Sequence, residues 1–388
     1  MKKLIAILAV VLSISSLPCL AECPTADLNG DCFVNFEDFA VLASQWFTGT
    51  PQDCPSSDLT GDCFVNLSDL VIMSSQWLTG ALPSDTNMIL IPGGTFQMGD
   101  SLDGESDALP VHTVTLSSFY MDKYDITNQQ YCDFLNSAAV KVVSGVVCAS
   151  TDNYNYYSYC NTSTADTYSQ IAYSGGVFSV RTKGSRSMVN DPMVCVSWYG
   201  AVAYCNWRSQ QEGKEQCYNL VTWDCNFSNN GYHLPTEAQW EYAARGGHSG
   251  NRFPWGDVNT ISHSQANYYS CIYCYSYDYG TPWGYDLTWS ADGIWPYTSP
   301  VGSFAANGYG LYDMSGNVYQ WCNDWYSNTY YSSSPQTNPT GPTSGSYPVL
   351  RGGCWNNDAS GCRVAYRHDN GPLGRDLNAG FRVSLDLN

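Results

Sequence analysis

The sequence predicts an α+β protein preceded by a small helical unit. Three observations predict this class. A duplicated segment near the N-terminus carries one short amphipathic helix per copy, the remaining chain shows few helical periods, and short strand-like runs alternate with turns along it. Residues 87–388 are long enough to form one substantial hydrophobic core.

The first 21 residues have the pattern of a bacterial secretory signal peptide. Lys2 and Lys3 precede an apolar run, and Cys19-Leu20-Ala21 precedes the expected cleavage point. A lipid anchor on Cys19 is the alternative, which Pro18 disfavours. No later apolar run approaches the roughly 20 residues of a membrane span. We therefore expect a secreted, cell-surface or periplasmic protein.

The amino-acid composition restricts the classes of molecule that the protein can bind. The chain has 16 Lys+Arg against 35 Asp+Glu, giving a net charge of −19. Nucleic acids and anionic membranes need clustered cations, so neither is expected as a partner. The 30 Tyr and 13 Trp residues suit contacts with proteins or glycans. The 17 Cys residues predict disulfides if the chain is exported.

Residues 23–49 recur as residues 54–80, and each copy has the spacing of an EF-hand-like loop followed by a helix. Alternating side-chain oxygens on such a loop can surround a hard cation. The candidate calcium ligands are Asp27, Asn29, Asp31, Asn35 and Asp38 in the first loop and Asp58, Thr60, Asp62, Asn66 and Asp69 in the second.

Position six of each loop, usually glycine, is Cys32 or Cys63. Each has a partner nine residues earlier, Cys23 or Cys54, so a local disulfide would replace the glycine turn. Two stapled hairpins without metal remain the alternative. The pair resembles a type I dockerin over residues 22–80, which implies bound calcium and docking to a cohesin-like protein. Thr60 predicts a weaker second site, and residues 81–86 form the expected linker.

In the large domain, three segments predict helices: Asp125–Leu135, Ser197–Ser209 and a short helix capped by Thr236. Four runs predict strands: Met88–Ile91, Thr113–Leu116, Val349–Arg351 and Gly380–Val383. Residues 148–190 predict an ordered insertion stapled by Cys148 and Cys160, with a tyrosine-rich binding surface as the alternative. Cys271 and Cys274 predict a structural disulfide rather than a zinc or redox site.

A series of motifs follows in order along the chain: Ile91–Gly99, Val196–Tyr199, Leu234–Gly246, Phe253–Gly256, Gly310–Val318, Arg351–Gly353 and Gly380–Val383. Together they resemble the formylglycine-generating enzyme (sulfatase-modifying factor) superfamily over residues 87–385. The resemblance implies an irregular C-type-lectin-like α+β fold with a small antiparallel sheet and two helices.

The same resemblance implies two calcium sites. The first would use the Asn267 and Asp292 side chains with the carbonyls of Tyr268 and Ile294. The second would use Asp313, the carbonyls of Gly316 and Val318, and Gln320. Because the family usually has Glu at the last place, Gln320 predicts weaker binding. Ordinary turn-forming residues are the alternative at both places.

Oxidising members of this superfamily bind Cu(I) through two cysteines spaced C-x4-C after an Arg-Gly-Gly-Ser stretch. Here Cys362 matches the second cysteine, Asn357 stands at the first, and Cys354 replaces the serine. One thiolate does not make a linear Cu(I) site. We therefore expect a Cys354–Cys362 disulfide, or pairing of Cys362 with a helix cysteine such as Cys205, rather than a copper pair.

Two functions remain open. The first is binding of a protein or glycan ligand through a surface of Trp355, Asn356, Asn357, Asp358, Tyr366, Arg367 and Arg375. The second is a metal-dependent oxidase of the formylglycine-generating type, acting on a protein cysteine, with Cys362 and Cys354 as catalytic candidates. The missing cysteine favours binding.

Overall fold

The computed structural model describes residues 28, 36–46, 55–60, 62–75, 87–152, 156–256 and 258–387. The chain divides into two compact units, Met1–Thr86 and Asn87–Asn388. The predicted signal peptide and the predicted linker lie outside the described residues. The boundary between the units agrees with the predicted start of the large domain.

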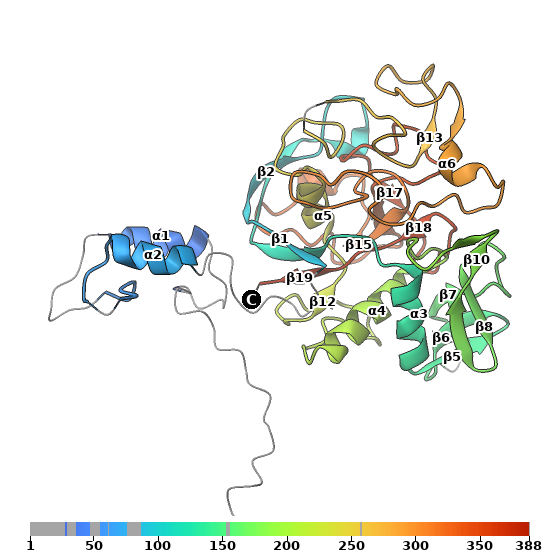
Figure 1. The fold of residues 1–388 in the computed structure, drawn as a ribbon, viewed down its shortest axis with the longest axis horizontal. Helices are drawn as coiled ribbons and strands as arrows, with labels where there is room; N and C mark the ends of the chain where they lie inside the picture. Colours follow the sequence, from blue (N-terminus) through green and yellow to red (C-terminus); the bar gives the residue numbers. More distant parts are fainter. Residues whose placement is uncertain are drawn as a thin grey trace, which may run out of the picture. The chain divides into compact units, whose positions relative to one another are not determined.

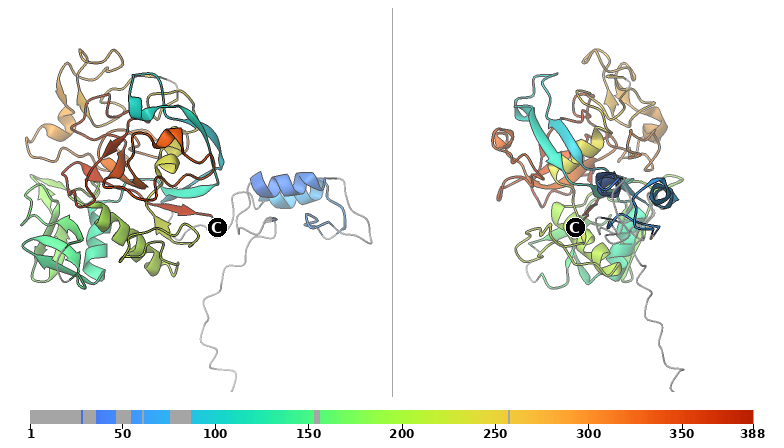
Figure 2. Two further views of the ribbon diagram at one scale, coloured as in Figure 1. Left: turned by 180° about the vertical axis from the view of Figure 1, so that it is seen from behind. Right: turned by 90° about the vertical axis from the view of Figure 1, so that its left-hand side faces the viewer.

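The small unit contains two helices that lie side by side, α1 (Phe36–Ser44) and α2 (Leu67–Ser75) (Figures 1 and 2). Leu42 of α1 and Met73 of α2 are fully buried in one cluster together with Val65. The helix predicted behind each loop is therefore confirmed. The cluster is small, and Leu67 at the start of α2 stays 66% exposed.

Two four-stranded sheets form the centre of the large unit. The first is antiparallel, in the order β1 (Met88–Ile91), β4 (Phe119–Asp122), β19 (Ser384–Asp386), β12 (Tyr232–His233). The second has the order β17 (His368–Asp369), β16 (Pro348–Arg351), β15 (Tyr319–Trp325), β18 (Ala379–Gly380). Strands β15 and β18 are parallel, whereas the other neighbours in this sheet are antiparallel.

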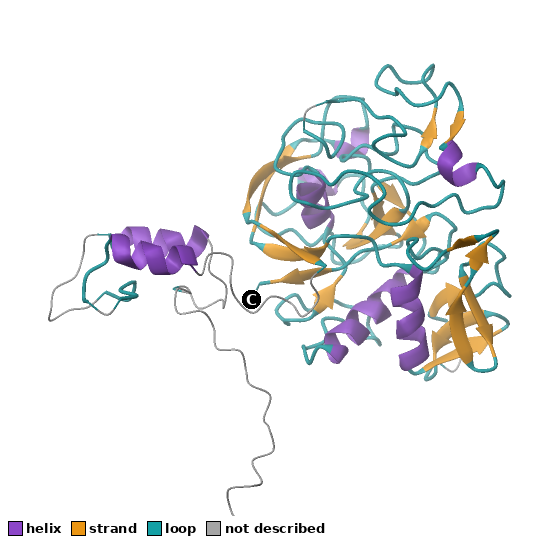
Figure 3. Cartoon of the chain, viewed as in Figure 1, coloured by secondary structure: helices purple, strands orange, loops and turns teal. Residues whose placement is uncertain are grey.

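Smaller sheets surround this centre. They are β2 (Gly94–Met98) with β3 (His112–Leu116), β5 (Val140–Val143) with β6 (Val146–Ala149) and β7 (Ser158–Asn161), β8 (Ile171–Ser174) with β9 (Val177–Val180), β10 (Thr182–Lys183) with β11 (Arg186–Ser187), and β13 (Tyr269–Ser270) with β14 (Gly284–Tyr285). Loops make up much of the remaining large unit (Figure 3).

The three predicted helices are confirmed as α3 (Asn128–Ser137), α4 (Trp198–Gln211) and α5 (Glu237–Ala244). Thr127, Ser197 and Thr236 are their N-caps, and the first and last of these form capping boxes with Gln130 and Gln239. Short helices are α6 (Leu287–Ser290) and the 3-10 turns Ser106–Ala108 and Tyr330–Ser332.

Two structural predictions are wrong. The segment predicted as one strand, Gly380–Val383, divides between sheets: β18 ends at Gly380 and pairs with β15, and β19 begins at Ser384 and pairs with β4. No disulfide joins Cys148 to Cys160, because the register partner of Cys160 on β6 is Val147, and Cys160 is a buried thiol. The insertion is ordered instead by strand pairing.

Within the described residues, we find no helix with the length and apolar character needed to cross a membrane.

Candidate functional site

The predicted cysteines are brought onto neighbouring segments by a glycine turn after β16. Gly352 and Gly353 have φ values of +92° and +71°. A Cβ on Gly353 would lie 2.6 Å from the Gly361 carbonyl oxygen and 3.0 Å from the Cys362 Cα. Only glycine lets the two segments approach this closely. The turn therefore brings Cys354 close to Cys362 along the backbone.

Both cysteines are fully buried thiols. The Cys354 Sγ lies 2.9 Å from Asn356 Oδ1 and 2.6 Å from Asn357 Oδ1, and Asn378 Nδ2 lies 3.5 Å from the same sulfur. Burial raises the pKa of Cys354 to about 12. At neutral pH this thiol is protonated and donates to a carboxamide oxygen.

Cys362 is also protonated at neutral pH. Burial raises its pKa well above the usual value, and Cys354 and nearby carboxylates raise it further, whereas the Cys354 backbone N–H opposes the shift. The predicted Cys354–Cys362 disulfide is absent, and Cys205 is likewise a buried thiol, so pairing of Cys362 with it is also wrong. The Cys354 sulfur is directed instead to the carboxamides of Asn356 and Asn357.

Three more side chains belong to this cysteine site and were not identified from sequence. Tyr319 at the start of β15 stacks on His368, with ring centroids 4.9 Å apart. Asn378 bridges the Cys354 sulfur and Asn356 Oδ1. Tyr319 and Asn378 lie beside the motifs Gly310–Val318 and Gly380–Val383, so closer attention to the residues flanking the motifs could have found them.

The predicted ligand surface is only partly at the surface. Asn356 is exposed, and Asn357, Asp358, Tyr366 and Arg375 are half-buried. Arg375 Nε donates to Asn161 Oδ1 on β7 at 2.7 Å.

Trp355 and Arg367 are corrections to that surface. Trp355 is fully buried, and its ring packs against Tyr285, Trp295 and Tyr297 at 5.3 to 5.6 Å. Arg367 is 5% exposed and forms a bidentate ion pair with Glu237, with distances of 2.6 and 2.8 Å. Both side chains are buried and bonded within the interior, so the prediction that they form part of an exposed surface is wrong.

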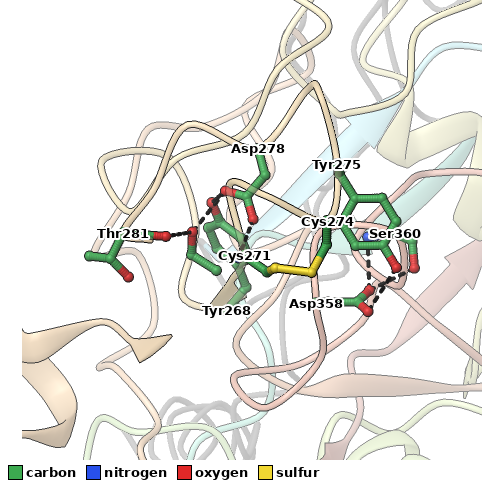
Figure 4. The surroundings of a disulfide bond; sticks show 9 residues. Tyr268, Cys271, Cys274, Tyr275, Asp278, Thr281, Asp358 and Ser360 are labelled. Atoms are coloured by element: carbon green, nitrogen blue, oxygen red, sulfur yellow. Dashed lines mark hydrogen bonds between the residues drawn. A yellow bond between two sulfur atoms is a disulfide. The ribbon is translucent and has the colours of Figure 1, made fainter. Parts of the chain in front are cut away.

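The predicted Cys271–Cys274 disulfide is confirmed, and the segment that follows it supports Asp358 (Figure 4). Tyr275 donates its hydroxyl to Asp358 Oδ2 at 2.9 Å. The Asp278 carboxylate accepts from the Tyr268 hydroxyl, the Ser270 hydroxyl and the Cys271 N–H at 2.5 to 2.9 Å (Figure 4). This bonding orders the loop next to the cysteine site.

Several groups of the first implied calcium site are bonded to other parts of the protein. Asn267 donates its amide N–H to the Tyr297 carbonyl at 2.7 Å, and the Tyr268 carbonyl lies 3.1 Å from His263 Nε2. Asp292 faces a cation of the chain itself, because its Oδ2 lies 3.5 Å from Lys183 Nζ.

Lys183 of β10 is 4% exposed and reaches into the loop that contains Asp292. Its Nζ donates to the carbonyls of Pro296 at 3.0 Å and Trp289 at 3.3 Å, and it lies 5.4 Å from the Tyr297 ring centroid. Two carbonyls and a carboxylate form the kind of oxygen set that calcium prefers. In this protein the Lys183 ammonium group is bonded to these oxygens.

The second implied calcium site fits poorly. Gln320 Oε1 accepts from Trp240 Nε1 at 2.6 Å and from Arg382 Nε at 2.8 Å, and its Nε2 donates to the Asp313 carbonyl at 2.8 Å. The Asp313 Oδ1 atom is buried without a hydrogen-bond partner, and burial raises the pKa of Asp313 to about 6. One unpaired oxygen of Asp313, beside the Arg382 guanidinium, does not supply the shell of oxygen ligands that calcium needs.

In the small unit, the second predicted loop folds back on its own backbone. Asp69 Oδ1 accepts from the N–H groups of Leu59 and Thr60, and the Thr60 hydroxyl lies 3.2 Å from both Asp58 Oδ1 and Asp69 Oδ1. Asp62 accepts from Phe64, and Asn66 from Ser68. Three predicted ligands, Asp58 and Thr60 of the loop and Asp69 of α2, thus lie close together.

Cys63 has φ +66°, so position six does adopt the conformation that glycine usually supplies. It is disulfide-bonded, whereas its predicted partner Cys54 lies outside the described residues. The remaining candidates of the first loop, Asp27, Asn29, Asp31 and Asn35, and the side chain of Asp38 also lie outside them. Across the described residues, no group of three or more His, Cys, Asp or Glu side chains could hold a metal.

The fold and the cysteine site define a mixed α/β domain with two buried thiols beside a carboxamide cluster, at the end of β16. The family described as the sulfatase-modifying factor enzyme 1-like domain matches residues 78–387. The chain belongs to this family.

Several relatives are similar over most of the chain. It is 34% identical over 308 residues to the serine/threonine-protein kinase pkn1 of Chlamydia pneumoniae, covering 79% of this chain but only 39% of that protein. It is 34% identical to the formylglycine-generating enzyme of Streptomyces coelicolor, covering 78% of this chain and 90% of the enzyme. A bovine protein named inactive C-alpha-formylglycine-generating enzyme 2 is 30% identical, with coverages of 77% and 87%.

Among solved structures, Treponema denticola variable protein 1 has the same fold, with a TM-score of 0.54 and 24% identity, covering 77% of this chain and 94% of that one.

Proposed function

We propose that the large unit is a ligand-binding member of its family that does not oxidise a sulfatase cysteine. The observation that carries this proposal is the side chain of Asn357, which presents a carboxamide oxygen 2.6 Å from the Cys354 thiol where the resemblance expects a copper-binding cysteine. Amide oxygen is a poor ligand for Cu(I), which prefers soft thiolates. The 30% identity to a bovine relative named inactive supports the same proposal.

The electrostatics of the site support this proposal. Metal binding and thiol chemistry need the thiolate, and burial raises the pKa of Cys354 to about 12 and that of Cys362 further. Around the thiols, exposed Asn356 and half-buried Asn357 and Asn378 present neutral donors and acceptors, and half-buried Asp358 adds carboxylate acceptors. Such groups suit a polar ligand, either a protein or a glycan.

The test compares the wild-type chain with the Cys354→Ser/Asn357→Cys double variant, which restores the family's serine and its C-x4-C pair. Each protein receives Cu(I), oxygen, a reductant and a peptide with the Cys-x-Pro-x-Arg motif. We expect copper binding only in the double variant and no aldehyde from the wild type, measured by mass spectrometry. The Streptomyces coelicolor enzyme serves as positive control. Peptide aldehyde formed by the wild type would overturn the proposal.

A metal-dependent oxidase remains the second candidate, because one observation favours it. The two thiols are reduced, and the Gly353 turn packs against the Cys362 backbone, so Cys354 and Cys362 lie on neighbouring segments. This reading predicts peptide aldehyde from the wild type that is lost in Cys354→Ser. The same assay therefore separates the two candidates.

We further propose that the chain is exported and that the small unit binds calcium and docks to a cohesin-like protein. The convergence of Asp58, Thr60 and Asp69 supports this role, as does the left-handed, disulfide-bonded Cys63 at position six. The alternative is a stapled helical hairpin without metal.

A further inference from the structure

A second concave site lies at the opposite end of β15 from Tyr319. Its volume is about 150 Å³, and its lining includes Trp198, Trp223, Phe227 and Trp325 with Asp224 and Asn323. Ligand pockets for drug-sized molecules are at least twice as large, so this cavity suits a single ring.

Trp223 has a strained backbone, with φ +67°. A bulky residue in the left-handed region is an outlier, and such strain persists where the surroundings enforce it, often at functional sites. Here a tight loop enforces it. The Trp223 N–H donates to the Asn219 carbonyl at 2.6 Å, and the Asn219 N–H donates to the Asp224 carbonyl at 3.0 Å.

The ring of Trp223 is held from one side by other aromatic rings. Tyr199 and Tyr157 lie with centroids 4.5 and 4.9 Å away. Trp198 also contacts Tyr199 at 5.6 Å, and it lies 5.9 Å from Trp325 with an interplanar angle of 30°. The Trp198 indole N–H donates to the Cys322 carbonyl and the ring is 2% exposed, so Trp198 backs the cavity, whereas half-buried Trp223 and Trp325 are the rings open to a ligand. The aromatic rings around the cavity are therefore packed against one another without a ligand.

Polar groups complete the cavity. The exposed Asp224 carboxylate makes no hydrogen bond or ion pair with the described residues. Asn323 Oδ1 accepts from the Tyr218 hydroxyl at 3.0 Å, which orients the amide and leaves its N–H groups to donate. One acceptor and one donor thus flank flat aromatic walls.

We propose that this cavity binds one neutral pyranose ring of a glycan. A pyranose has apolar C–H faces that pack on indole rings and equatorial hydroxyls that pair with a carboxylate and an amide. Asp224 and the net charge of −19 disfavour acidic sugars. This inference is independent of whether the cysteine site binds a ligand or performs an oxidation.

The test uses the full chain with methyl β-D-glucopyranoside, methyl β-D-galactopyranoside and D-glucuronic acid, followed by saturation-transfer NMR and titration. We expect at least one neutral glycoside to bind, and glucuronic acid to bind at least tenfold more weakly. Trp325→Ala and Trp223→Gly should each raise the Kd at least tenfold. Glycine adopts φ +67° without strain, so Trp223→Gly removes the ring while preserving the loop.

The matched control is Trp283→Ala, because Trp283 is 62% exposed and does not line the cavity. It should leave the Kd unchanged. Asp224→Asn, at an exposed position, tests the polar contact without touching the aromatic walls. The proposal is overturned if no neutral glycoside binds at 20 mM, if Trp283→Ala weakens binding as much as Trp325→Ala, or if glucuronic acid binds best.

Discussion

Lys183 is a buried ammonium group in the large unit, bonded to two carbonyls and paired with Asp292. Replacing it with Met keeps most of the side-chain volume but leaves Asp292 and two carbonyls without their donor. Because Asp292 is 35% exposed, water can partly replace the ammonium. We expect Lys183→Met to lower the free energy of unfolding by about 2 kcal/mol, measured by urea denaturation of the full chain.

Lys214→Met is the control for that variant, since half-buried Lys214 forms no ion pair within the described residues and its Nζ lies only at the edge of contact with a ring, 6.0 Å from the Tyr232 centroid. This control variant should change the free energy of unfolding by no more than about 0.5 kcal/mol. Equal losses in the two variants would contradict the role of Lys183. A wild-type large unit that loses stability in EDTA would contradict it as well, because calcium would then be required.

The buried carboxyl group of Asp324, near the end of β15, predicts that the stability of the folded protein depends on pH. Burial, followed by the charge of Glu237, raises its pKa from 3.8 to about 8. The folded state therefore holds a proton that the unfolded chain releases, so this group lowers stability as pH rises from about 4 to 8. We expect the urea midpoint of Asp324→Asn, measured relative to that of the wild type, to rise between pH 5 and pH 8.

Asp125 has the same pKa direction, and burial likewise raises its pKa to about 8. The Asp324→Asn variant should therefore keep part of the wild-type pH slope. Parallel curves for wild type and variant across this range would show that Asp324 does not hold a proton near neutral pH.

Individual positions in the cysteine site were predictable, whereas the burial of their neighbours was not. Counting from Arg351-Gly-Gly placed Cys354, Asn357 and Cys362 together, because the spacing of one turn is local. The burial of Arg367 depends on Glu237, which lies 130 residues earlier in the chain. Sequence spacing gives no information on such a long-range ion pair.

Helix caps give the clearest prediction for individual elements. The side chains of Thr127 and Thr236 accept from the N3 backbone N–H of α3 and α5, and the Gln side chain at N3 bonds back to the cap. Thr127→Ala and Thr236→Ala should each lower the free energy of unfolding by about 1 kcal/mol. The helices lie in different hydrophobic clusters, so the double variant should cost nearly the sum in a urea titration.

A serine substitution at either position is the control, because serine caps about as well as threonine. A threonine whose loss costs nothing would mean that packing alone defines that helix start.

Helices were predicted better than strands, for a physical reason. Capping signals and the 3.6-residue period are local, so α3, α4 and α5 were found with errors of about three residues or fewer at their starts. The short strands depend on partners far away in sequence: β19 pairs with β4 and β12, and β18 with β15. The apolar run Gly380–Val383 gave no sign that it crosses between two sheets.

The whole molecule consists of two units, which we expect to unfold in separate transitions. The small unit has a core of only three fully buried apolar residues among those described, so it should depend on its loops and disulfides for stability. If its loops bind calcium, the ion stabilises the folded state alone. Calcium at 100 times its Kd would then add about 2.7 kcal/mol to the small unit.

We therefore expect calcium to raise the melting temperature of the small unit in calorimetry of the full chain and to leave the large unit unchanged. The Asp27→Ala/Asp58→Ala variant should lose this response, because it removes position one of both loops. Asp224→Ala, in the large unit, should retain it. A calcium shift confined to the large unit would instead favour the second family site around Asp313. No shift in either unit would reduce residues 22–80 to a disulfide-stapled helical hairpin, and docking would then have to be calcium-independent.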